Sequence, residues 1–194
     1  MASHVVLTVA PEDAERSIAT IVTAFSSDPF VRWMLPEPTQ YLTYFADAVR
    51  LFAGGAFQSE SAYRSEDFMA AALWLPPGVH PDEEPLGELM QAALPEDVQP
   101  DAFGVLEQMG NSHPEGDHWY LPMIGVDPAR QGMGYGSALL AHSLEACDAS
   151  HLPAYLESTS PRNIPLYERY GFKLTGEIQV GSSPPIWPMV REAR

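Results

Sequence analysis

One short segment of the chain places three glycines at every second position, between an apolar run and a stretch with helical spacing. The segment is Gln131-Gly132-Met133-Gly134-Tyr135-Gly136-Ser137, and the apolar run before it is 121–126. Glycines at such a junction let a ligand approach the backbone, and the start of a helix offers unpaired N–H groups with a partial positive charge. The chemistry that this pattern favours is the binding of a phosphate group.

Two common kinds of phosphate-binding loop fit the segment poorly. A P-loop needs Gly-Lys-Ser/Thr, and the only lysine of the chain is Lys173. A dinucleotide-binding loop needs G-x-G-x-x-G, and Ser137 occupies the position of the last glycine. Glu157, 21 residues after Gly136, keeps a dinucleotide as an alternative, but the 58 residues that follow Gly136 are too few for the rest of a doubly wound domain.

A second segment, 155–172, carries polar residues at helical spacing. Asn163 and Tyr167 lie four residues apart and would share one face of a helix. Pro165 suits the first turn of that helix, and Gly171 suits the position just past its end. Glu157 closes the strand that we expect before it.

Together, the two segments resemble the GNAT superfamily of N-acetyltransferases. The first is similar to that family's Gln-x-x-Gly-x-Gly loop for acyl-CoA, and the second to its Asn-x-x-x-Tyr-x-x-x-Gly-Phe helix, in the same order. The C-terminal half, with the aromatic segment 25–35 and the strand around Trp74, looks most like puromycin N-acetyltransferase and its relatives. The resemblance implies an α/β (α+β) GNAT fold: one mixed, largely antiparallel sheet of about six or seven strands with a central splay and helices on both faces.

The resemblance also implies an enzyme that transfers an acetyl group from acetyl-CoA to a primary amine by direct attack in a ternary complex. The loop amides and Arg130 would hold the pyrophosphate, although a solvated surface role for Arg130 stays open. The pantetheine arm would pair with the backbone of the preceding strand. The expected cofactor-binding residues are Ile124, Val126, Arg130, Gln131, Gly132, Met133, Gly134, Tyr135, Gly136, Ser137, Asn163 and Tyr167.

Two residues are expected to move protons. By the resemblance, Tyr167 donates to the leaving thiolate; a packed core aromatic is the alternative. An alkylamine has a pKa near ~10.4, so a base must deprotonate it or the site must bind its neutral form. Glu157 is the first candidate base, directly or through a water, with His118 and Tyr120 as weaker candidates and a structural carboxylate as the other interpretation of Glu157.

Strands alternate with helices along the chain, which favours a mixed α/β layer structure. Strands are expected at 5–9, 56–63, 68–75, 118–126, 154–157, 172–180 and 186–190, and helices at 11–25, 30–35, 39–52, 86–93, 97–109, 137–148 and 163–170. Thr39 is a candidate cap for the third helix. No domain boundary is evident, so 1–194 is predicted as one domain, with 76–117 as a helical and loop insertion that covers the acceptor site.

Pro122 is unusual in a strand that should be central, because proline removes a hydrogen bond from the sheet. A bulge or splay at this point would free backbone groups of Met123, Ile124 and Val126 to bind a ligand. An N–H near Met123 or Ile124 could then stabilise an oxyanion. An ordinary edge strand is the alternative.

Composition excludes several classes of function. The net charge of −16 disfavours nucleic acid and anionic lipid as partners. No apolar run approaches the ~20 residues of a membrane span, and no secretion signal is evident, so the cytoplasm is the expected location. With Cys147 as its only cysteine, the chain has no intramolecular disulfide and no thiolate cage, and no metal site is predicted. Cys147 itself is expected to be a small buried residue.

No motif specifies the acceptor. Aromatic and apolar residues of the N-terminal half could line a pocket or belong to the core: Phe30, Trp33, Met34, Tyr41, Tyr44, Phe45 and Trp74. Asp28 and the acidic segment 82–84 could attract a cationic amine. We expect a small-molecule amine; a protein N-terminus or lysine, and a non-catalytic acyl-CoA-binding module, stay as alternatives. A homodimer is compatible with the resemblance, without a sequence feature that marks an interface.

Overall fold

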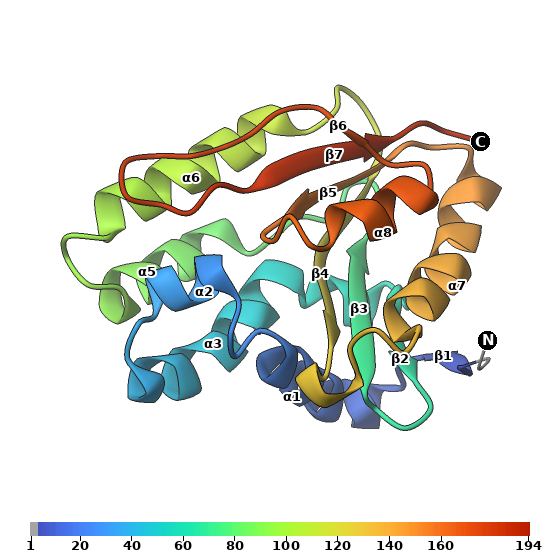
Figure 1. Cartoon of the computed structure of the whole chain (residues 1–194), viewed down its shortest axis with the longest axis horizontal. Helices are drawn as coiled ribbons and strands as arrows, with labels where there is room; N and C mark the ends of the chain where they lie inside the picture. The colour runs from blue at the N-terminus through green and yellow to red at the C-terminus, as the bar shows by residue number, and fades with distance from the viewer. Residues whose placement is uncertain (1–3) are drawn as a thin grey trace.

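A seven-stranded mixed sheet crosses the computed structural model, which describes residues 4–194 (Figure 1). Residues 1–3 of the predicted domain lie outside the described residues. The strand order is β1-β2-β3-β4-β5-β7-β6, and every neighbouring pair is antiparallel except β4 and β5. The strands are β1 Val6–Thr8, β2 Ala62–Ser65, β3 Ala70–Leu75, β4 Trp119–Val126, β5 Ala154–Ser158, β6 Lys173–Leu174 and β7 Trp187–Arg191. The predicted fold class is confirmed.

Helices cover both faces of the sheet (Figure 1). Helices α1 and α3 pack on one face of β3 and β4, and α7 packs on the other face. The helices are η1 Pro11–Asp13, α1 Ala14–Ala24, α2 Pro29–Met34, α3 Pro38–Ala53, α4 Gly55–Gln58, α5 Glu83–Ala93, α6 Gln99–Ser112, η2 Pro128–Arg130, α7 Tyr135–Ser150 and α8 Ile164–Arg169. None of the helices within 4–194 combines the length and the apolar character that a membrane crossing requires.

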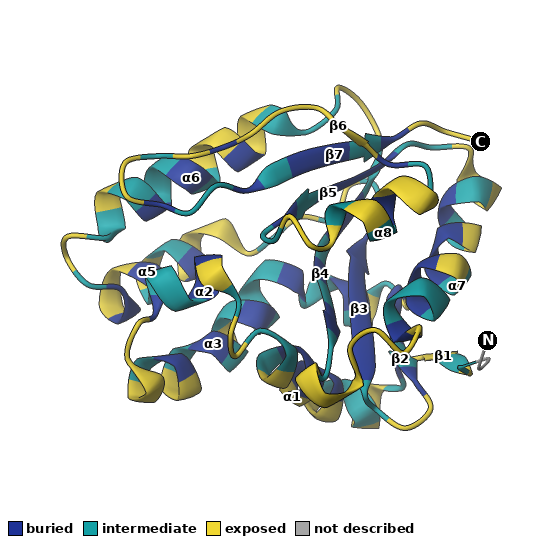
Figure 2. Cartoon of the chain, viewed as in Figure 1, coloured by how far each residue is buried: buried dark blue, intermediate teal, exposed yellow. Residues whose placement is uncertain are grey.

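Strand β3 is the most deeply buried part of the sheet. All six of its residues are buried, and Figure 2 shows the strand in dark blue between helices whose outer faces are exposed. A strand that is covered on both faces reads as a continuous apolar run rather than as an alternating one. This explains the sequence Ala-Ala-Ala-Leu-Trp-Leu.

Strand β4 contains a bulge at the proline. Leu73 of β3 lies opposite Met123, whereas Leu75 lies opposite Tyr120, so β4 has one residue more than β3 over this stretch. Pro122 falls inside it, where a missing N–H donor costs no regular sheet bond. The predicted bulge is confirmed, and the alternative of an edge strand is wrong, because β4 is the central strand.

Beyond the bulge, β4 separates from β5. The two strands pair only through Trp119 with Ala154 and Tyr120 with Tyr155, and then run in different directions (Figure 1). The edge of β4 that faces β5 is therefore open over its second half. This is the central splay that the resemblance to the GNAT superfamily implies.

Three local predictions are wrong. Residues 56–58 belong to helix α4, because Ala56 and its neighbours continue in a helical turn that packs on β3; strand β2 begins only at Ala62. Helix α3 begins at Pro38 with Glu37 as its cap, so Thr39 lies inside the first turn. Residues 172–180 form only the two-residue strand β6 and an isolated bridge at Ile178, because Gly176 and the turn after Val180 interrupt the pairing.

Candidate active site

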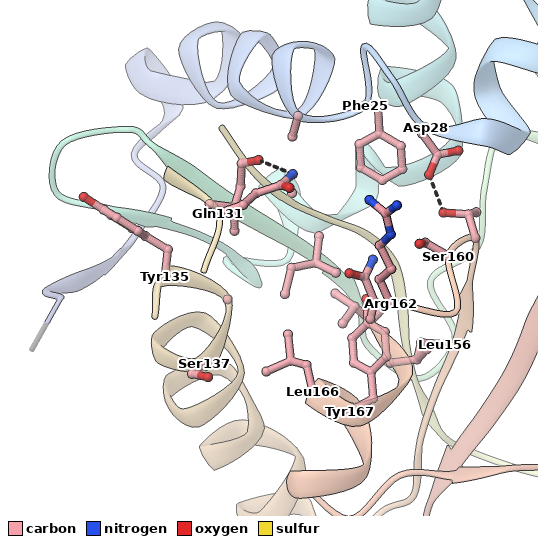
Figure 3. A pocket seen from close by; sticks show the side chains of 18 of the residues that line it. Phe25, Asp28, Gln131, Tyr135, Ser137, Leu156, Ser160, Arg162, Leu166 and Tyr167 are labelled. Carbon is pink, nitrogen blue, oxygen red and sulfur yellow. Dashed lines mark hydrogen bonds between the residues drawn. The ribbon is translucent and has the colours of Figure 1, made fainter. Parts of the chain in front are cut away.

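A cavity of about 800 Å³ opens where β4 and β5 separate. Its walls come from the end of α1, β4, the glycine loop, the first turn of α7, the end of β5 and α8 (Figure 3). We call it the donor cavity, because the sequence predicts that the acyl donor binds to these residues. All the predicted site residues except Met133 line it: Ile124, Val126, Arg130, Gln131, Gly132, Gly134, Tyr135, Gly136, Ser137, Glu157, Asn163 and Tyr167. The fold thus brings the two sequence motifs to one place.

Two loop residues direct their side chains elsewhere. The side chain of Met133 is 52% exposed, and its carbonyl accepts a hydrogen bond from His4 Nε2 at 2.9 Å. The Tyr135 hydroxyl donates to Asp67 Oδ2 at 2.6 Å, and its ring stacks on that of His4. Tyr135 therefore turns away from the donor cavity, as Figure 3 shows, and its backbone is the part available to a ligand.

The loop requires glycine at its three positions for two different structural reasons. Gly132 and Gly134 have φ values of 76° and 95°, in the left-handed region that side chains disfavour. Gly136 has an ordinary helical backbone, but a Cβ there would lie 3.2 Å from Leu166 Cδ2. Its lack of a side chain lets α7 and α8 pack closely beside the donor cavity.

The first turn of α7 faces the donor cavity with unpaired donors. The amides of Tyr135, Gly136 and Ser137 belong to the first turn, where the helix has no carbonyl group to accept a hydrogen bond from them. Tyr170 holds α8 against this turn, because its hydroxyl donates to the Ser137 carbonyl at 2.6 Å. Gln131 Nε2 donates to the Val126 carbonyl at 3.4 Å, which joins the loop to the end of β4 (Figure 3). Such an arrangement suits a phosphate group.

Three arginines line the donor cavity: Arg130, Arg162 and Arg169. The whole chain has only ten lysines and arginines against 26 acidic residues, so this gathering creates a local positive charge in an acidic protein. Sequence reasoning identified Arg130 alone. Arg162 directly precedes Asn163 and points into the cavity in Figure 3, and this adjacency was the signal that could have identified it.

Glu157 lines the donor cavity, with its side chain 3% exposed. Burial raises the pKa of this carboxyl group to about 7, and the neighbouring phenol groups of Tyr120 and Tyr155 only partly offset that effect. A carboxyl group with this pKa can exchange a proton near neutral pH.

Two histidines stand behind Glu157. His118 Nδ1 lies 2.8 Å from the Gly116 carbonyl and donates to it, and a second hydrogen bond, also of 2.8 Å, joins His118 Nε2 to His113 Nδ1. His113 Nε2 faces Glu157 Oε1 at 3.8 Å. Burial, followed by the charges of His118 and His80, lowers the pKa of His113 to about 4 and keeps it neutral.

The two weaker candidate bases are not part of the described wall of the donor cavity. Neither His118 nor Tyr120 is among the described residues that line the donor cavity. Tyr120 is 6% exposed, and burial, together with the charge of Glu157, raises its pKa. His113 was missed in the sequence, because it lies 44 positions before Glu157 and only the fold joins them.

Tyr167 presents its ring to the donor cavity beside Leu156 (Figure 3). The residue is 5% exposed, and its ring packs edge-on against Phe172. Burial, and then the negative charge of Asp28, raise the pKa of its hydroxyl group well above the usual value of 10. Tyr167 therefore keeps its proton at neutral pH and can donate a hydrogen bond.

Asp28 ties the N-terminal helices to the end of β5. Its Oδ1 accepts from the amides of Phe30 and Val31 at 3.0 Å each, which begins α2, and its Oδ2 accepts from the Thr159 hydroxyl (Figure 3). Burial raises the pKa of Asp28. The predicted acceptor-attracting residue thus has a structural role, although it also lines the donor cavity.

A second cavity, the apolar pocket, of about 110 Å³, adjoins the first. Phe25, Pro122, Glu157 and Thr159 line both cavities. The other walls come from α2, α3, α5 and α6, with side chains such as Phe30, Phe45, Met90 and Met109. Glu157 and Thr159 are the only polar residues among the described residues that line it.

The predicted acceptor residues divide between pocket and core. Phe30, Met34 and Phe45 line the apolar pocket, whereas Tyr41 and Trp74 are buried away from it. Trp33 and Tyr44 are absent from its described wall. Cys147 is fully buried as expected, and burial raises the pKa of its thiol to about 12. Over residues 4–194, no three metal-ligating side chains gather in one place.

Known proteins share both the sequence pattern and the fold. The sequence profile of the Acetyltransferase (GNAT) family matches residues 33–172. An uncharacterized N-acetyltransferase of Schizosaccharomyces pombe is 26% identical over 210 residues, which cover 95% of this chain and 81% of that protein.

Solved structures agree. One described as histone acetyltransferase HPA2 and related acetyltransferase, from Corynebacterium glutamicum, matches with a TM-score of 0.69 and 25% identity over 100% of this chain and 98% of that one. Arylalkylamine N-acetyltransferase 2 from Aedes aegypti matches with a TM-score of 0.68 over 100% of both chains, and its 11% identity shows the fold alone. With the profile covering most of its length, the chain belongs to the GNAT family of acetyltransferases.

Proposed function

We propose that this enzyme transfers an acetyl group from acetyl-CoA to the primary amine of a small molecule, by direct attack in a ternary complex. The observation that carries the proposal is the single donor cavity in which the glycine loop, the open edge of β4, Glu157 and Tyr167 meet. Acetyl-CoA supplies the activated acetyl thioester.

The residues of the donor cavity fit a CoA molecule. Left-handed Gly132 and Gly134 and the first-turn amides of α7 form a cradle for the pyrophosphate, with Arg130 beside it. The backbone of Ile124 and Val126, unpaired toward β5, can hydrogen-bond the amides of the pantetheine arm. An N–H near Met123 or Ile124 can stabilise the oxyanion at the thioester carbonyl.

Two side chains then have separate roles. Glu157 removes the proton of the attacking amine, directly or through a water, because its pKa lies near neutral pH. Tyr167, which stays protonated, donates a hydrogen bond from its hydroxyl group to the sulfur of the leaving thiolate and stabilises the charge there. Asn163, at the start of α8, contacts the cofactor arm.

The segment 76–117 supports a small acceptor. Its helices α5 and α6 form walls of the apolar pocket and close the space beside Glu157. As part of the same proposal, 1–194 is one domain, and this insertion covers the acceptor site. An open groove for a protein substrate would require these helices to be elsewhere.

Two measurements test the proposal. Acetyl-CoA should raise the melting temperature, since a ligand that binds the native state stabilises it. A library of primary amines with acetyl-CoA should release free CoA thiol, with the Glu157→Gln variant as the control for uncatalysed release. No shift at millimolar acetyl-CoA would remove the donor assignment. A shift without thiol release from any amine would leave an acyl-CoA-binding module.

A further inference from the structure

The wall of the apolar pocket includes the proposed base. Glu157 and Thr159, at the end of β5, line both this pocket and the donor cavity. An amine whose nitrogen lies at Glu157 can therefore place the rest of its molecule in the apolar pocket. This inference rests on the proposed function and adds the class of acceptor.

The size of the pocket limits what can enter. Its volume is about 110 Å³. A dry protein cavity of ~150 Å³ lined by leucine, isoleucine and phenylalanine binds benzene. The apolar pocket has about three-quarters of that volume, which suits one small apolar group such as a single aromatic ring or a short alkyl chain.

The walls of the pocket exclude a second charge. Apart from Glu157 and Thr159, its described lining side chains are apolar, and several of them, such as Phe45 and Met90, are more than nine-tenths buried. A distant ammonium group would lose its hydration without gaining a partner. Glu157, the one acidic side chain in the described wall of the pocket, already serves the reacting amine.

Methionines make the pocket tolerant of shape. Four of the eight methionines of the chain line it: Met34, Met90, Met109 and Met123. The unbranched thioether side chain adapts to irregular neighbours, so a ring and a chain can both be accommodated. The pocket should therefore discriminate between amines by their charge more strongly than by their shape.

We infer that the acceptor is a primary monoamine whose uncharged, apolar body occupies the apolar pocket while its nitrogen lies at Glu157. Polyamines and other amines with a second cationic group are poor acceptors in this arrangement. The pocket, the position of Glu157 and the absence of a second charged side chain in the described wall carry the inference together.

A matched pair of amines tests the inference on the unmodified enzyme. Hexylamine and 1,5-diaminopentane have similar lengths, and the second carries an ammonium group where the first carries a methyl group. We expect kcat/KM for hexylamine to exceed that for the diamine at least about 100-fold, because an unpaired charge would have to be buried. 2-Phenylethylamine should stay within about tenfold of hexylamine.

A filling variant locates the binding place. Ala48→Leu on α3 reduces the pocket, so the ratio of kcat/KM for hexylamine to that for ethylamine should fall at least about tenfold. Thr43→Leu, at an exposed position of the same helix, is the matched control and should leave the ratio unchanged. The melting temperature of each variant reports whether it folds.

Three outcomes would overturn the inference. Equal or faster acetylation of the diamine would contradict it and leave the proposed function intact. An unchanged ratio in a folded Ala48→Leu variant would place the acceptor outside the apolar pocket. No acetylation of any amine, with the acetyl-CoA shift present, would remove both the acceptor class and the proposed function.

Discussion

At neutral pH the carboxyl group of Glu157 is close to half protonated, because burial raises its pKa to about 7. If it is the base, kcat should fall as the pH decreases through about 7, since only the carboxylate can accept a proton. Glu157→Gln should lower kcat by about 10²–10⁴ and remove this dependence. The measurement is kcat against pH with both substrates saturating. A dependence that persists unchanged in the variant would place the base elsewhere.

The same group makes a prediction about stability. Its pKa in the folded protein lies above its ordinary value of 4.5, so between about pH 4.5 and 7 the folded state binds more protons than the unfolded state. The contribution of this group to the free energy of unfolding should therefore fall as the pH rises through this window, whereas His113, whose pKa is lowered to about 4, contributes the opposite slope. Urea unfolding at several pH values should show a free energy of unfolding that rises more with pH for Glu157→Gln than for Glu115→Gln, a change at an exposed position. Identical curves would argue against the buried, titrating carboxyl group.

In the proposed mechanism, Tyr167 acts only on the leaving thiolate. Tyr167→Phe keeps the buried ring and removes the hydroxyl group, so kcat should fall tenfold or more while the KM for acetyl-CoA changes little. Steady-state kinetics with a fixed amine measures both values. Tyr170→Phe, which loses the bond to the Ser137 carbonyl instead, should act mainly on acetyl-CoA binding. An unchanged kcat in the Tyr167 variant would exclude it from the mechanism.

Single residues differ in how far the sequence predicts them. The placement of Glu157 and Tyr167 in one cavity follows from motifs whose spacing corresponds to a strand end and a helical turn. His113 behind Glu157 and the Asp28–Thr159 bond join segments distant along the chain. No local pattern could have indicated them, because only the packing of α6 and α2 beside β5 creates these contacts.

At the level of elements, the glycine loop depends on backbone conformations that other residues resist. Gly134→Ala places a side chain at φ 95°, which should destabilise the protein by about 1–2 kcal/mol. The shifted amides should also weaken acetyl-CoA binding about tenfold, a change of ~1.4 kcal/mol. Urea unfolding and calorimetric titration measure the two effects.

A second glycine provides the control for that variant. Gly110 lies in α6 with open space around its Cβ position, so Gly110→Ala should stabilise the helix by up to about 1 kcal/mol and leave acetyl-CoA binding unchanged. Equal losses in both variants would mean that the left-handed backbone at Gly134 is not needed.

Elements with a regular pattern could be predicted, and irregular ones could not. The bulge of β4 follows from Pro122, and the limits of α7 differ from expectation by two residues at each end. The sequence predicts a strand where helix α4 lies, since four residues are too few to show helical periodicity. Residues 172–180 are predicted as one strand, but their turns reduce them to the two-residue strand β6 and an isolated bridge at Ile178.

The charge of the whole molecule works against its stability. With 26 acidic and ten basic residues, the folded chain repels itself at pH 7, and dissolved salt screens this repulsion. The melting temperature should rise by several degrees between about 0.01 and 0.3 M NaCl at pH 7. Near pH 4.5, the isoelectric point of the sequence, the same salt should have little effect. A similar salt dependence at both pH values would contradict electrostatic self-repulsion.

The four residues common to the two cavities have a thermodynamic consequence. Phe25, Pro122, Glu157 and Thr159 form a shared wall, so a ligand on one side changes the surface presented to the other. By linkage, the factor by which an amine changes the affinity for acetyl-CoA equals the factor by which acetyl-CoA changes the affinity for the amine. A binding cycle measured along both routes therefore gives one coupling energy for the wall, and substitutions of Thr159 would alter that energy rather than the affinity of a single ligand.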